Sequence, residues 1–550
     1  MKRSTLILIL ATAALAAACG DTGTPEDAAA PNLDVTDGDV TKVEPGKADS
    51  SAEAVFVDME FDGELLASSG FNAKRHIDEQ LLYTIGHLNG SRAVGRLDKV
   101  VLSNVKTEAA GDATRITYTA SLQVAWGSKT NVPSEYVFML PRDVRFAGLE
   151  EFTKEYSHDC VDFGAHDVDT GSMWYYYRPS RRGCQIKDSH IVTTTAQVTV
   201  SAVNTTGKYP EYHKVWEDGT LNVVAVFGKY EDGKTTDADA GIAAYNRFHT
   251  EIQRALSRHG LTTAPADLGS RPGVDAPEIR YEAMIDGDHR VVVTALLVDN
   301  IRTAPRAFNE RYAELSKDAD LVVYNGHAGL GANIRALARK GSWVEGQYAI
   351  IFMNGCDTYA YVDSALFDAH AAVNDDDDKG TKYADLVTNA LPSFFRSMPA
   401  ATMALVKGLM AFDDPRTYEQ MFRDVDSSQV ILVSGEEDNV FVPGMDDDIT
   451  PVDSWTGLAL GGKVAKNEEI RFETPELPAG TYTFLMEGTG DADLYVRIGD
   501  APDQRKFDCR PFKASSSETC QVEITSPTVI HGMVRGWDAS SDFDLVGSGE

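Results

Sequence analysis

The sequence predicts a multidomain protein with an α+β domain, an α/β domain and an all-β sandwich, in that order. Residues 54–220 contain β-branched and aromatic runs around one helical segment. Residues 221–445 alternate continuous apolar strands with helices, which is typical of a mainly parallel sheet covered by helices on both faces. Residues 446–550 consist of short strands separated by Gly and Pro turns, the pattern of a small β-sandwich.

The first 53 residues precede these domains. Lys2 and Arg3 are followed by an apolar run, and small residues lead into Cys19, so residues 1–18 are predicted to be an export signal. This arrangement resembles a bacterial lipoprotein signal, which implies that lipid on Cys19 anchors the protein to a membrane of the cell envelope. An ordinary cleaved signal, with release from the cell, is the alternative. Residues 19–53 lack aromatic residues and a hydrophobic period, which predicts a disordered tether.

The net charge restricts the classes of partner. The chain carries a formal charge of −33 at pH 7, whereas binding to nucleic acid requires basic patches that displace counterions. We therefore expect no nucleic-acid partner. The charge suits an exported protein that self-repulsion keeps soluble, and it is compatible with calcium binding.

The six cysteines divide into groups. Cys19 belongs to the signal. Cys160 and Cys184 lie close together in one segment, and Cys509 and Cys520 in another, so two local disulfides are expected in an exported protein. Cys356 is then left over. A leftover thiol is either well buried or retained for its reactivity.

The α+β domain is expected to hold one helix and at least four strands. Its helical segment covers 73–88, and its strands are predicted at 99–105, 114–126, 135–140 and 191–203. A polar segment between the last two strands offers metal-binding side chains. A structural role is favoured over a metal site because the spacing matches no metal motif; the residues are His158, Asp159, His166, Asp167 and Asp169.

The α/β domain is read as strands and helices in alternation. Strands are predicted at 220–228, 289–300, 320–329, 348–359 and 428–435, and helices at 240–260, 306–319, 333–341, 382–398 and 400–411. In such a sheet the ligand site lies outside the carboxyl ends of the strands.

His327 and Cys356 occupy equivalent places in this pattern. Each follows an apolar strand, in "LVVYNGHAG" and "AIIFMNGC", and each has a glycine beside it. Parallel strands would bring both side chains to one edge, where an imidazole can take the proton of a thiol that attacks a substrate. Gly355 and the Ala328–Gly329 turn would let backbone N–H groups approach an oxyanion. The alternative is that Cys356 is a core thiol and His327 caps a loop.

This pair of strand ends resembles the signature of caspase-like cysteine peptidases, which include caspases, legumains, clostripain, gingipains and separase. The resemblance covers about 221–445, and the separation of 29 residues (356 − 327) is most similar to the gingipains. It implies that Cys356 is the nucleophile and His327 the general base and acid, with backbone N–H groups of Cys356 and of Ala328 or Gly329 around the oxyanion. The chain departs from the family in reading His-Ala-Gly where the family has glycine directly after the histidine.

The C-terminal segment resembles the bacterial pre-peptidase C-terminal domain, a secreted β-sandwich that usually accompanies peptidases. The matching stretches are "GTGDADLYV" at 488–496, "DCRP" at 508–511 and "ETC" at 518–520. Asp491 and Asp493 in the first stretch either bind calcium or cap a turn. Attachment to peptidases is an association and leaves the catalytic chemistry to the α/β domain.

Two acidic segments are further candidates for parts of the substrate site. Residues 374–380, "NDDDDKG", follow the strand before Cys356 and suit calcium, a substrate rim or a solvated insertion. Residues 436–438, Glu-Glu-Asp, end the last predicted strand and are expected at the same sheet edge as His327 and Cys356, where they would bind a basic side chain.

These observations predict an exported, lipid-anchored cysteine endopeptidase that cleaves protein or peptide substrates through a thioester on Cys356. No cofactor is required for this chemistry, although calcium could support loops. The alternative function is a non-catalytic surface lipoprotein with a degenerate caspase-like domain that acts in adhesion or in glycan or protein binding. The His-Ala-Gly departure favours this alternative.

Overall fold

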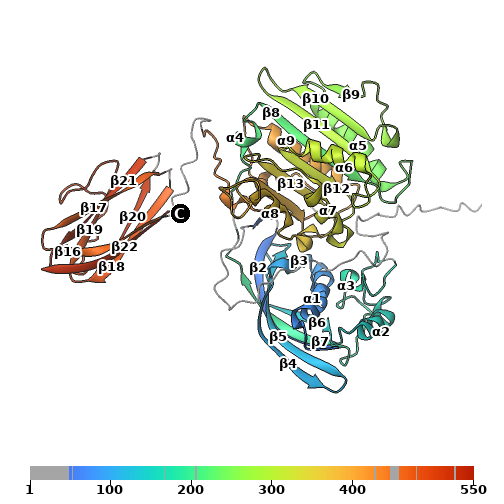
Figure 1. The fold of residues 1–550 in the computed structure, drawn as a ribbon, viewed down its shortest axis with the longest axis horizontal. Helices are drawn as coiled ribbons and strands as arrows, with labels where there is room; N and C mark the ends of the chain where they lie inside the picture. The colour runs from blue at the N-terminus through green and yellow to red at the C-terminus, as the bar shows by residue number, and fades with distance from the viewer. Residues whose placement is uncertain are drawn as a thin grey trace, which may run out of the picture. The chain divides into compact units, whose positions relative to one another are not determined.

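The computed structural model divides the chain into two compact units, the first ending at Pro443 and the second beginning at Gly444 (Figure 1). It describes residues 49–51, 54–165, 167–202, 204, 207–426, 429–445, 457–477, 480–524 and 528–549. Cys19, the signal, most of the predicted tether and His166 lie outside the described residues. None of the helices in the described part of the chain has both the length and the apolar character needed to cross a bilayer.

The first unit begins with a curled antiparallel sheet whose strand order is β3-β5-β2-β7-β6, with β4 paired to β5. Its strands are β2 (Val55–Ala67), β3 (Ala93–Gly95), β4 (Val101–Ala110), β5 (Ala113–Trp126), β6 (Glu135–Pro141) and β7 (Ile191–Val200). The predicted helix is present as α1 (Ala73–Asn89), which packs on β3 and β6. Strand β2 was not predicted, although its buried and exposed residues alternate over much of its length.

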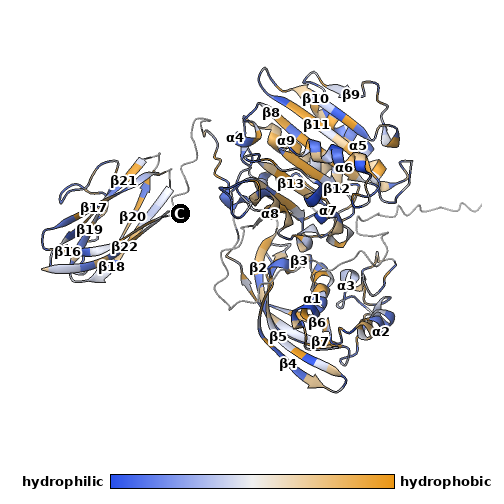
Figure 2. Cartoon of the chain, in the orientation of Figure 1, coloured by the Kyte–Doolittle hydropathy of each residue, from blue (hydrophilic) through white to orange (hydrophobic). Residues whose placement is uncertain are grey.

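A nine-stranded mixed sheet follows, in the order β1-β15-β14-β13-β12-β8-β11-β10-β9. The five central strands are parallel and almost wholly buried, and Figure 2 shows them as hydrophobic ribbons. The strands are β1 (Asp49–Ser51), β8 (Thr220–Gly228), β9 (Thr262–Ala264), β10 (Glu278–Met284), β11 (Arg290–Val298), β12 (Leu321–Asn325), β13 (Ala349–Asn354), β14 (Ala384–Asn389) and β15 (Ile431–Ser434).

Two predictions about this sheet were wrong. Residues 49–51, assigned to the tether, form β1 and pair with β15 at the sheet edge. Residues 384–389, assigned to a helix, form β14. Every residue of β14 is buried, and such a strand has no alternation in polarity, so periodicity could not distinguish it from a buried helix.

The order of connections gives the sheet a switch point between β8 and β12. From β8 the chain crosses to β11 on one side, and from β11 it returns past β8 to β12, β13 and β14 on the other side. Right-handed crossovers in opposite directions place α5 (Ala240–Leu256) on one face and α6 (Arg306–Leu315), α7 (Ala332–Lys340) and α8 (Ala365–Ala371) on the opposite face. Helix α9 (Met398–Met410) packs against α5. In open α/β sheets, ligands bind at such a switch point.

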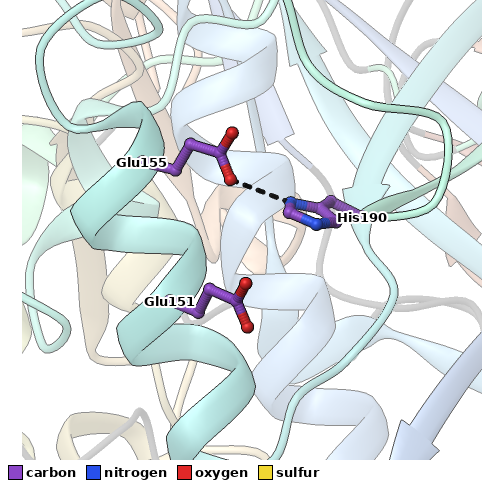
Figure 3. Close-up of side chains that lie close together, drawn as sticks. All are labelled: Glu151, Glu155 and His190. Carbon is purple, nitrogen blue, oxygen red and sulfur yellow. Dashed lines mark ion pairs between the residues drawn. The ribbon is translucent and has the colours of Figure 1, made fainter.

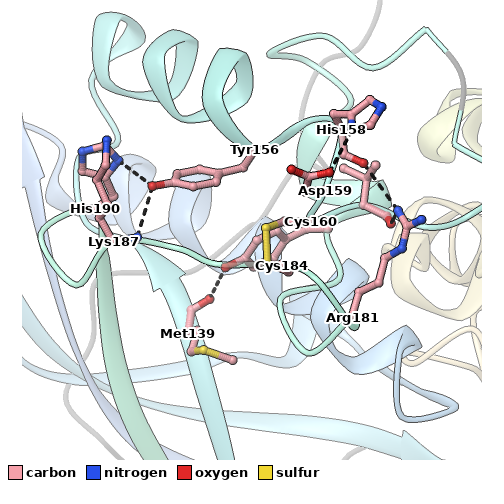
Figure 4. Close-up of a disulfide and its surroundings, with 11 residues drawn as sticks. Met139, Tyr156, His158, Asp159, Cys160, Arg181, Cys184, Lys187 and His190 are labelled. Atoms are coloured by element: carbon pink, nitrogen blue, oxygen red, sulfur yellow. Dashed lines mark hydrogen bonds and ion pairs between the residues drawn. A yellow bond between two sulfur atoms is a disulfide. The ribbon is translucent and has the colours of Figure 1, made fainter.

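A disulfide between Cys160 and Cys184 closes the polar segment after α2 (Phe146–Tyr156), the pairing that the sequence predicts (Figure 4). The aromatic run forms the short helix α3 (Met173–Tyr176), which is buried beside it. The hydroxyl of Tyr156 contacts His190 Nδ1 at 3.0 Å and accepts a hydrogen bond from Lys187 N at 3.2 Å. Packing and a covalent link therefore fix this loop.

The second unit contains two antiparallel sheets, β16-β22-β18-β20 and β17-β21-β19, around one apolar core. This arrangement is the predicted β-sandwich, and Cys509 pairs with Cys520 as expected. Its strands are β16 (Leu458–Ala465), β17 (Glu469–Leu477), β18 (Gly480–Thr489), β19 (Ala492–Ile498), β20 (Glu518–Ile524), β21 (Thr528–Gly536) and β22 (Ser540–Gly549).

Removing the Cys160–Cys184 disulfide by a double Cys→Ala substitution should lower the unfolding free energy of the first unit by about 3 kcal/mol, because the bond closes a loop of 24 residues in the unfolded chain. Denaturant unfolding followed by circular dichroism measures this change. The matched control is the double Cys→Ala variant at Cys509 and Cys520, which should alter only the transition of the second unit. An unchanged first-unit transition in the Cys160–Cys184 variant would contradict the prediction.

Candidate functional site

The strands that precede His327 and Cys356 are neighbours in the central sheet. β12 and β13 pair in parallel, with Asn325 opposite Asn354, so the two turns that follow leave the same edge side by side. A side chain at Gly355 would place its Cβ 2.9 Å from the carbonyl oxygen of Gly326 and 3.2 Å from Ala328 N. The turns therefore touch, and only glycine fits at position 355.

A buried network of amides holds these strand ends. Asn354 Nδ2 donates to Asn325 Oδ1 at 2.8 Å, and Asn389 Nδ2 on β14 donates to Asn354 Oδ1 at 3.1 Å. Gln429 Nε2 also donates to Asn354 Oδ1, at 3.0 Å, and to Ser393 Oγ, at 2.9 Å. These side chains are buried, and losing one partner would leave others unsatisfied. Sequence reasoning missed this network, although an asparagine ends three neighbouring strands.

His327 lies at the switch point of the sheet. Its Nε2 is 3.0 Å from the carbonyl oxygen of Tyr230, which follows β8. A carbonyl only accepts, so Nε2 carries the hydrogen and Nδ1 is the basic nitrogen of the neutral ring. The imidazole packs against the rings of Tyr230 and Phe395, with centroids 5.1 and 5.3 Å away. Asn333 Nδ2 donates to the carbonyl oxygen of His327 at 2.6 Å and fixes the turn.

Cys356 is buried, with 1% of its surface exposed. Its sulfur lies 3.3 Å from Ser393 N and 3.4 Å from the carbonyl oxygen of Ser393. The segment from Leu391 to Phe395 thus contacts the sulfur through Ser393 and the imidazole of His327 through Phe395.

The turn after His327 has an unusual backbone. Gly329, Leu330 and Gly331 all have positive φ angles, of 57°, 49° and 91°. Leucine rarely adopts this region, so packing holds it there. The turn presents Ala328 N beside Gly355, which is the side on which an oxyanion-binding N–H was expected.

Asp357, next to Cys356, joins this edge to the N-terminal sheet domain. Its carboxylate accepts hydrogen bonds from Tyr175 OH at 2.7 Å and from Asn89 Nδ2 at 2.9 Å. Burial raises the pKa of Asp357 to about 6, against the lowering effect of these two donors. The N-terminal domain also covers the segment after Cys356, because Phe56 contacts the ring of Tyr359 with centroids 5.9 Å apart. These contacts were not predicted from the sequence pattern.

The acidic residues 436–438 were wrongly predicted to share this edge. β15 is antiparallel to β14, with Ser434 opposite Leu386 and Ile431 opposite Asn389. The residues after β15 therefore lie at the start of β14, at the opposite edge from His327 and Cys356. Within residues 374–380, Asp377 is buried and accepts hydrogen bonds from the backbone of Thr381 and Lys382, which indicates a structural turn.

Two other groups of side chains could hold a cation. Glu151, Glu155 and His190 present ligand atoms within 4.8 Å of one another (Figure 3), but Lys187 already pairs with Glu155 at 2.5 Å. In the second unit, Asp493 accepts a hydrogen bond from Arg510 Nη2 at 2.6 Å. A calcium ion at Asp491 and Asp493 would therefore compete with a guanidinium.

Comparison with known proteins finds similarity over only part of the chain. No family model matches it. The neutral protease of Vibrio proteolyticus is 39% identical over 94 residues, which are 16% of this chain and 15% of that protein. The alkaline serine exoprotease A of Vibrio alginolyticus is 33% identical over 92 residues, 16% of this chain and 17% of that protein. The zinc metalloprotease of Helicobacter pylori is 41% identical over 61 residues, 11% of this chain and 24% of that protein.

The chain thus spans less than a quarter of the length of these curated relatives. Among solved structures, the solution structure of vEP C-ter 100 is 28% identical, covers 16% of this chain and 88% of that chain, and has a TM-score of 0.15. A C-terminal region of about 90 residues resembles the pre-peptidase C-terminal domain of secreted Vibrio proteases. This similarity is confined to the C-terminal region and does not identify the chemistry of the α/β domain.

Asp357→Asn should weaken the dependence of stability on pH. The folded chain binds a proton at Asp357 more tightly than the unfolded chain, so this contribution is complete below pH 3.8 and is lost as the pH rises through about 6. The unfolding free energy of the wild type should fall between pH 4 and pH 7. In the variant this fall should be smaller by about 3 kcal/mol, at about 1.4 kcal/mol per pKa unit. Urea unfolding at the two pH values measures it.

The exposed Asp378→Asn variant is the control and should match the wild type at both pH values. Burial also raises the pKa of Asp385 to about 6. Asp385 is present in the wild type and in both variants, so its contribution to the pH dependence of stability is the same in all three proteins. Equal pH dependence in the wild type and Asp357→Asn would contradict the assignment.

Proposed function

We propose that the protein is an exported cysteine-type endopeptidase in which Cys356 is the nucleophile and His327 the general base and acid. The observation that carries the proposal is the pairing of β12 with β13, which sets the turns of His327 and Cys356 side by side at the switch point of the sheet. The C-terminal similarity to secreted proteases adds a context in which protein is the substrate.

The catalytic type has to come from the chain's own residues. The relatives that share the C-terminal segment include proteins named as a serine exoprotease and as a zinc metalloprotease. A segment common to proteases of different types does not determine the nucleophile.

The proposed reaction is acyl transfer. His327 Nδ1 takes the thiol proton while the sulfur of Cys356 attacks the peptide carbonyl, and the backbone N–H groups of Ala328 and Cys356 stabilise the oxyanion. The imidazolium then protonates the leaving amine, which leaves a thioester on Cys356. His327 next removes a proton from water, whose attack releases the acid and regenerates the thiol. The hydrogen bond from Nε2 to Tyr230 would orient the ring throughout.

One change has to precede catalysis. The segment from Leu391 to Phe395 must move away from the sulfur, since Cys356 is 1% exposed. The proposed enzyme is therefore inactive in the conformation described and requires this segment to open.

The burial of Cys356 also favours a second candidate, a non-catalytic surface protein that retains the fold. A buried sulfur is what a structural cysteine would show. Adhesion or binding of glycan or protein would then be the function. Peptidase activity that depends on Cys356 separates the two candidates.

The proposed chemistry needs no cofactor, and calcium would act only on loops. We further propose that lipid on Cys19 holds the protein at the cell envelope, periplasmic or at the surface, with release from the cell if the signal is cleaved without lipidation.

Reduced protein should cleave casein or an internally quenched peptide, and Cys356→Ser and His327→Ala should each lower kcat/KM by at least about 1,000-fold. Activity should require a thiol such as dithiothreitol and should be blocked by iodoacetamide. His259→Ala, a partly buried histidine outside the site, is the matched control and should keep full activity. Cleavage that is equal in the wild type and Cys356→Ser would refute the proposal, and its absence from reduced, folded protein would favour the second candidate.

The lipid anchor predicts that cells fed a radioactive or alkyne-tagged fatty acid incorporate the label into the wild-type chain. Cys19→Ser should abolish labelling and release the protein from the membrane fraction. Equal labelling of the two chains would exclude Cys19 as the lipid site.

A further inference from the structure

A cavity of about 460 Å³ lies within the first unit, between the N-terminal domain and the turn that follows His327. Its floor is apolar and aromatic, and it is formed by Leu82 and Tyr83 of α1, Val144, Leu149 of α2 and Trp174 of α3. Cavities of this size hold small organic molecules or a short stretch of peptide.

The cavity adjoins both turns of the candidate site. Leu330, three residues after His327, lines it from the central sheet and is held with a φ angle of 49°. On the opposite wall, Trp174 lines the cavity, and the next residue, Tyr175, donates to Asp357 beside Cys356. A ligand in the cavity would therefore contact Leu330 in the turn after His327. It would also contact Trp174, which is next to the residue that is hydrogen-bonded beside Cys356.

The rim indicates the chemistry of the occupant. Phe146 lines the cavity and is 76% exposed, which is unusual for a large aromatic side chain. Arg75 is also exposed, and it lies 3.4 Å from Glu79 in a surface ion pair that contributes little to stability. His76 is 3.3 Å from the same carboxylate. Glu79 also lines the cavity, and Arg145, which pairs with Asp143 at 2.7 Å, is a second guanidinium on the lining. In a chain with a net charge of −33, two guanidinium groups at an apolar cavity favour a ligand that carries a carboxylate beside an apolar group.

We propose that this cavity binds a polypeptide segment in which a large apolar or aromatic side chain is adjacent to an acidic residue. The apolar side chain enters between Leu149 and Trp174, with Phe146 closing over it, and the carboxylate pairs with Arg75. Because it rests on the proposed peptidase function, the inference names this segment as the part of the substrate that anchors it beside Cys356. It assigns to the N-terminal domain a role in selecting substrates.

The binding step can be tested without catalysis. Three fluorescein-labelled peptides would be compared by anisotropy: Gly-Gly-Phe-Asp-Gly-Gly-amide, the same peptide with Ala for Phe, and the same peptide with Asn for Asp. The wild-type protein is measured beside Cys356→Ser, which cannot cleave the probe, and the two should bind it equally. The Phe-Asp probe should bind at least about five-fold more tightly than either of the other two, a difference of about 1 kcal/mol.

Four variants locate the site. Leu149→Glu should abolish binding of the Phe-Asp probe, because it places a charge in the apolar floor. Phe146→Ala should weaken binding of that probe at least about five-fold, whereas Phe163→Ala, at a phenylalanine 93% exposed in the same domain, should change nothing. Arg75→Gln should remove the preference for Asp over Asn but keep that for Phe over Ala. Because Phe146 and Arg75 are exposed, these variants remain informative if Leu149→Glu does not fold.

Failure of this inference is distinguishable from failure of the proposed function. Equal affinity for the Phe and Ala probes, no binding by the wild type, or equal binding by wild type and Phe146→Ala would overturn the peptide site whatever the catalytic result. Selective binding without hydrolysis by reduced protein would support the site and refute the peptidase. Hydrolysis of Phe-Asp and Ala-Asp substrates with equal kcat/KM would overturn only the role in substrate selection.

Discussion

The hydrogen bond between Asn354 and Asn325 is the contact on which the geometry of the candidate site depends. It joins the last residues of β12 and β13, and Asn389, Ser393 and Gln429 complete its surroundings. A buried amide that loses a partner pays the cost of its desolvation, so the network tolerates few alternative arrangements. The turns of His327 and Cys356 start from this fixed point. Gly355 then allows the two turns to touch.

The N-terminal domain, which is distant in sequence, covers the turn that contains Cys356. Asp357 accepts hydrogen bonds from Asn89 and Tyr175, and Arg96 lies over the ring of Tyr359 at 5.5 Å. The N-terminal domain is therefore packed onto the edge of the central sheet that carries His327 and Cys356, rather than attached to it by a linker. This packing buries that edge, and it also creates the cavity that reaches the turn after His327.

The central sheet was largely predictable because its strands are continuous apolar runs that end in glycine-containing turns. The same pattern predicted that His327 and Cys356 occupy equivalent positions, each directly after an apolar strand. The side on which residues 436–438 lie was not predictable, since nothing in "SQVILVSG" reveals that β15 runs antiparallel. β2 was missed because its acidic residues and glycine interrupt the apolar pattern of a long, paired strand. The contacts of Asp357 arise from long-range packing, which local periodicity does not encode.

The central sheet is long, with nine strands, yet its two outermost members, β1 and β9, have only three residues each. An exposed edge offers unpaired N–H and C=O groups to another chain, and short terminal strands limit that opportunity. β1 covers the backbone of β15 through the pairing of Ser50 with Val433. The few residues that precede the N-terminal domain therefore act against self-association. A chain that began at residue 54 would uncover β15, and light scattering would reveal any resulting aggregation.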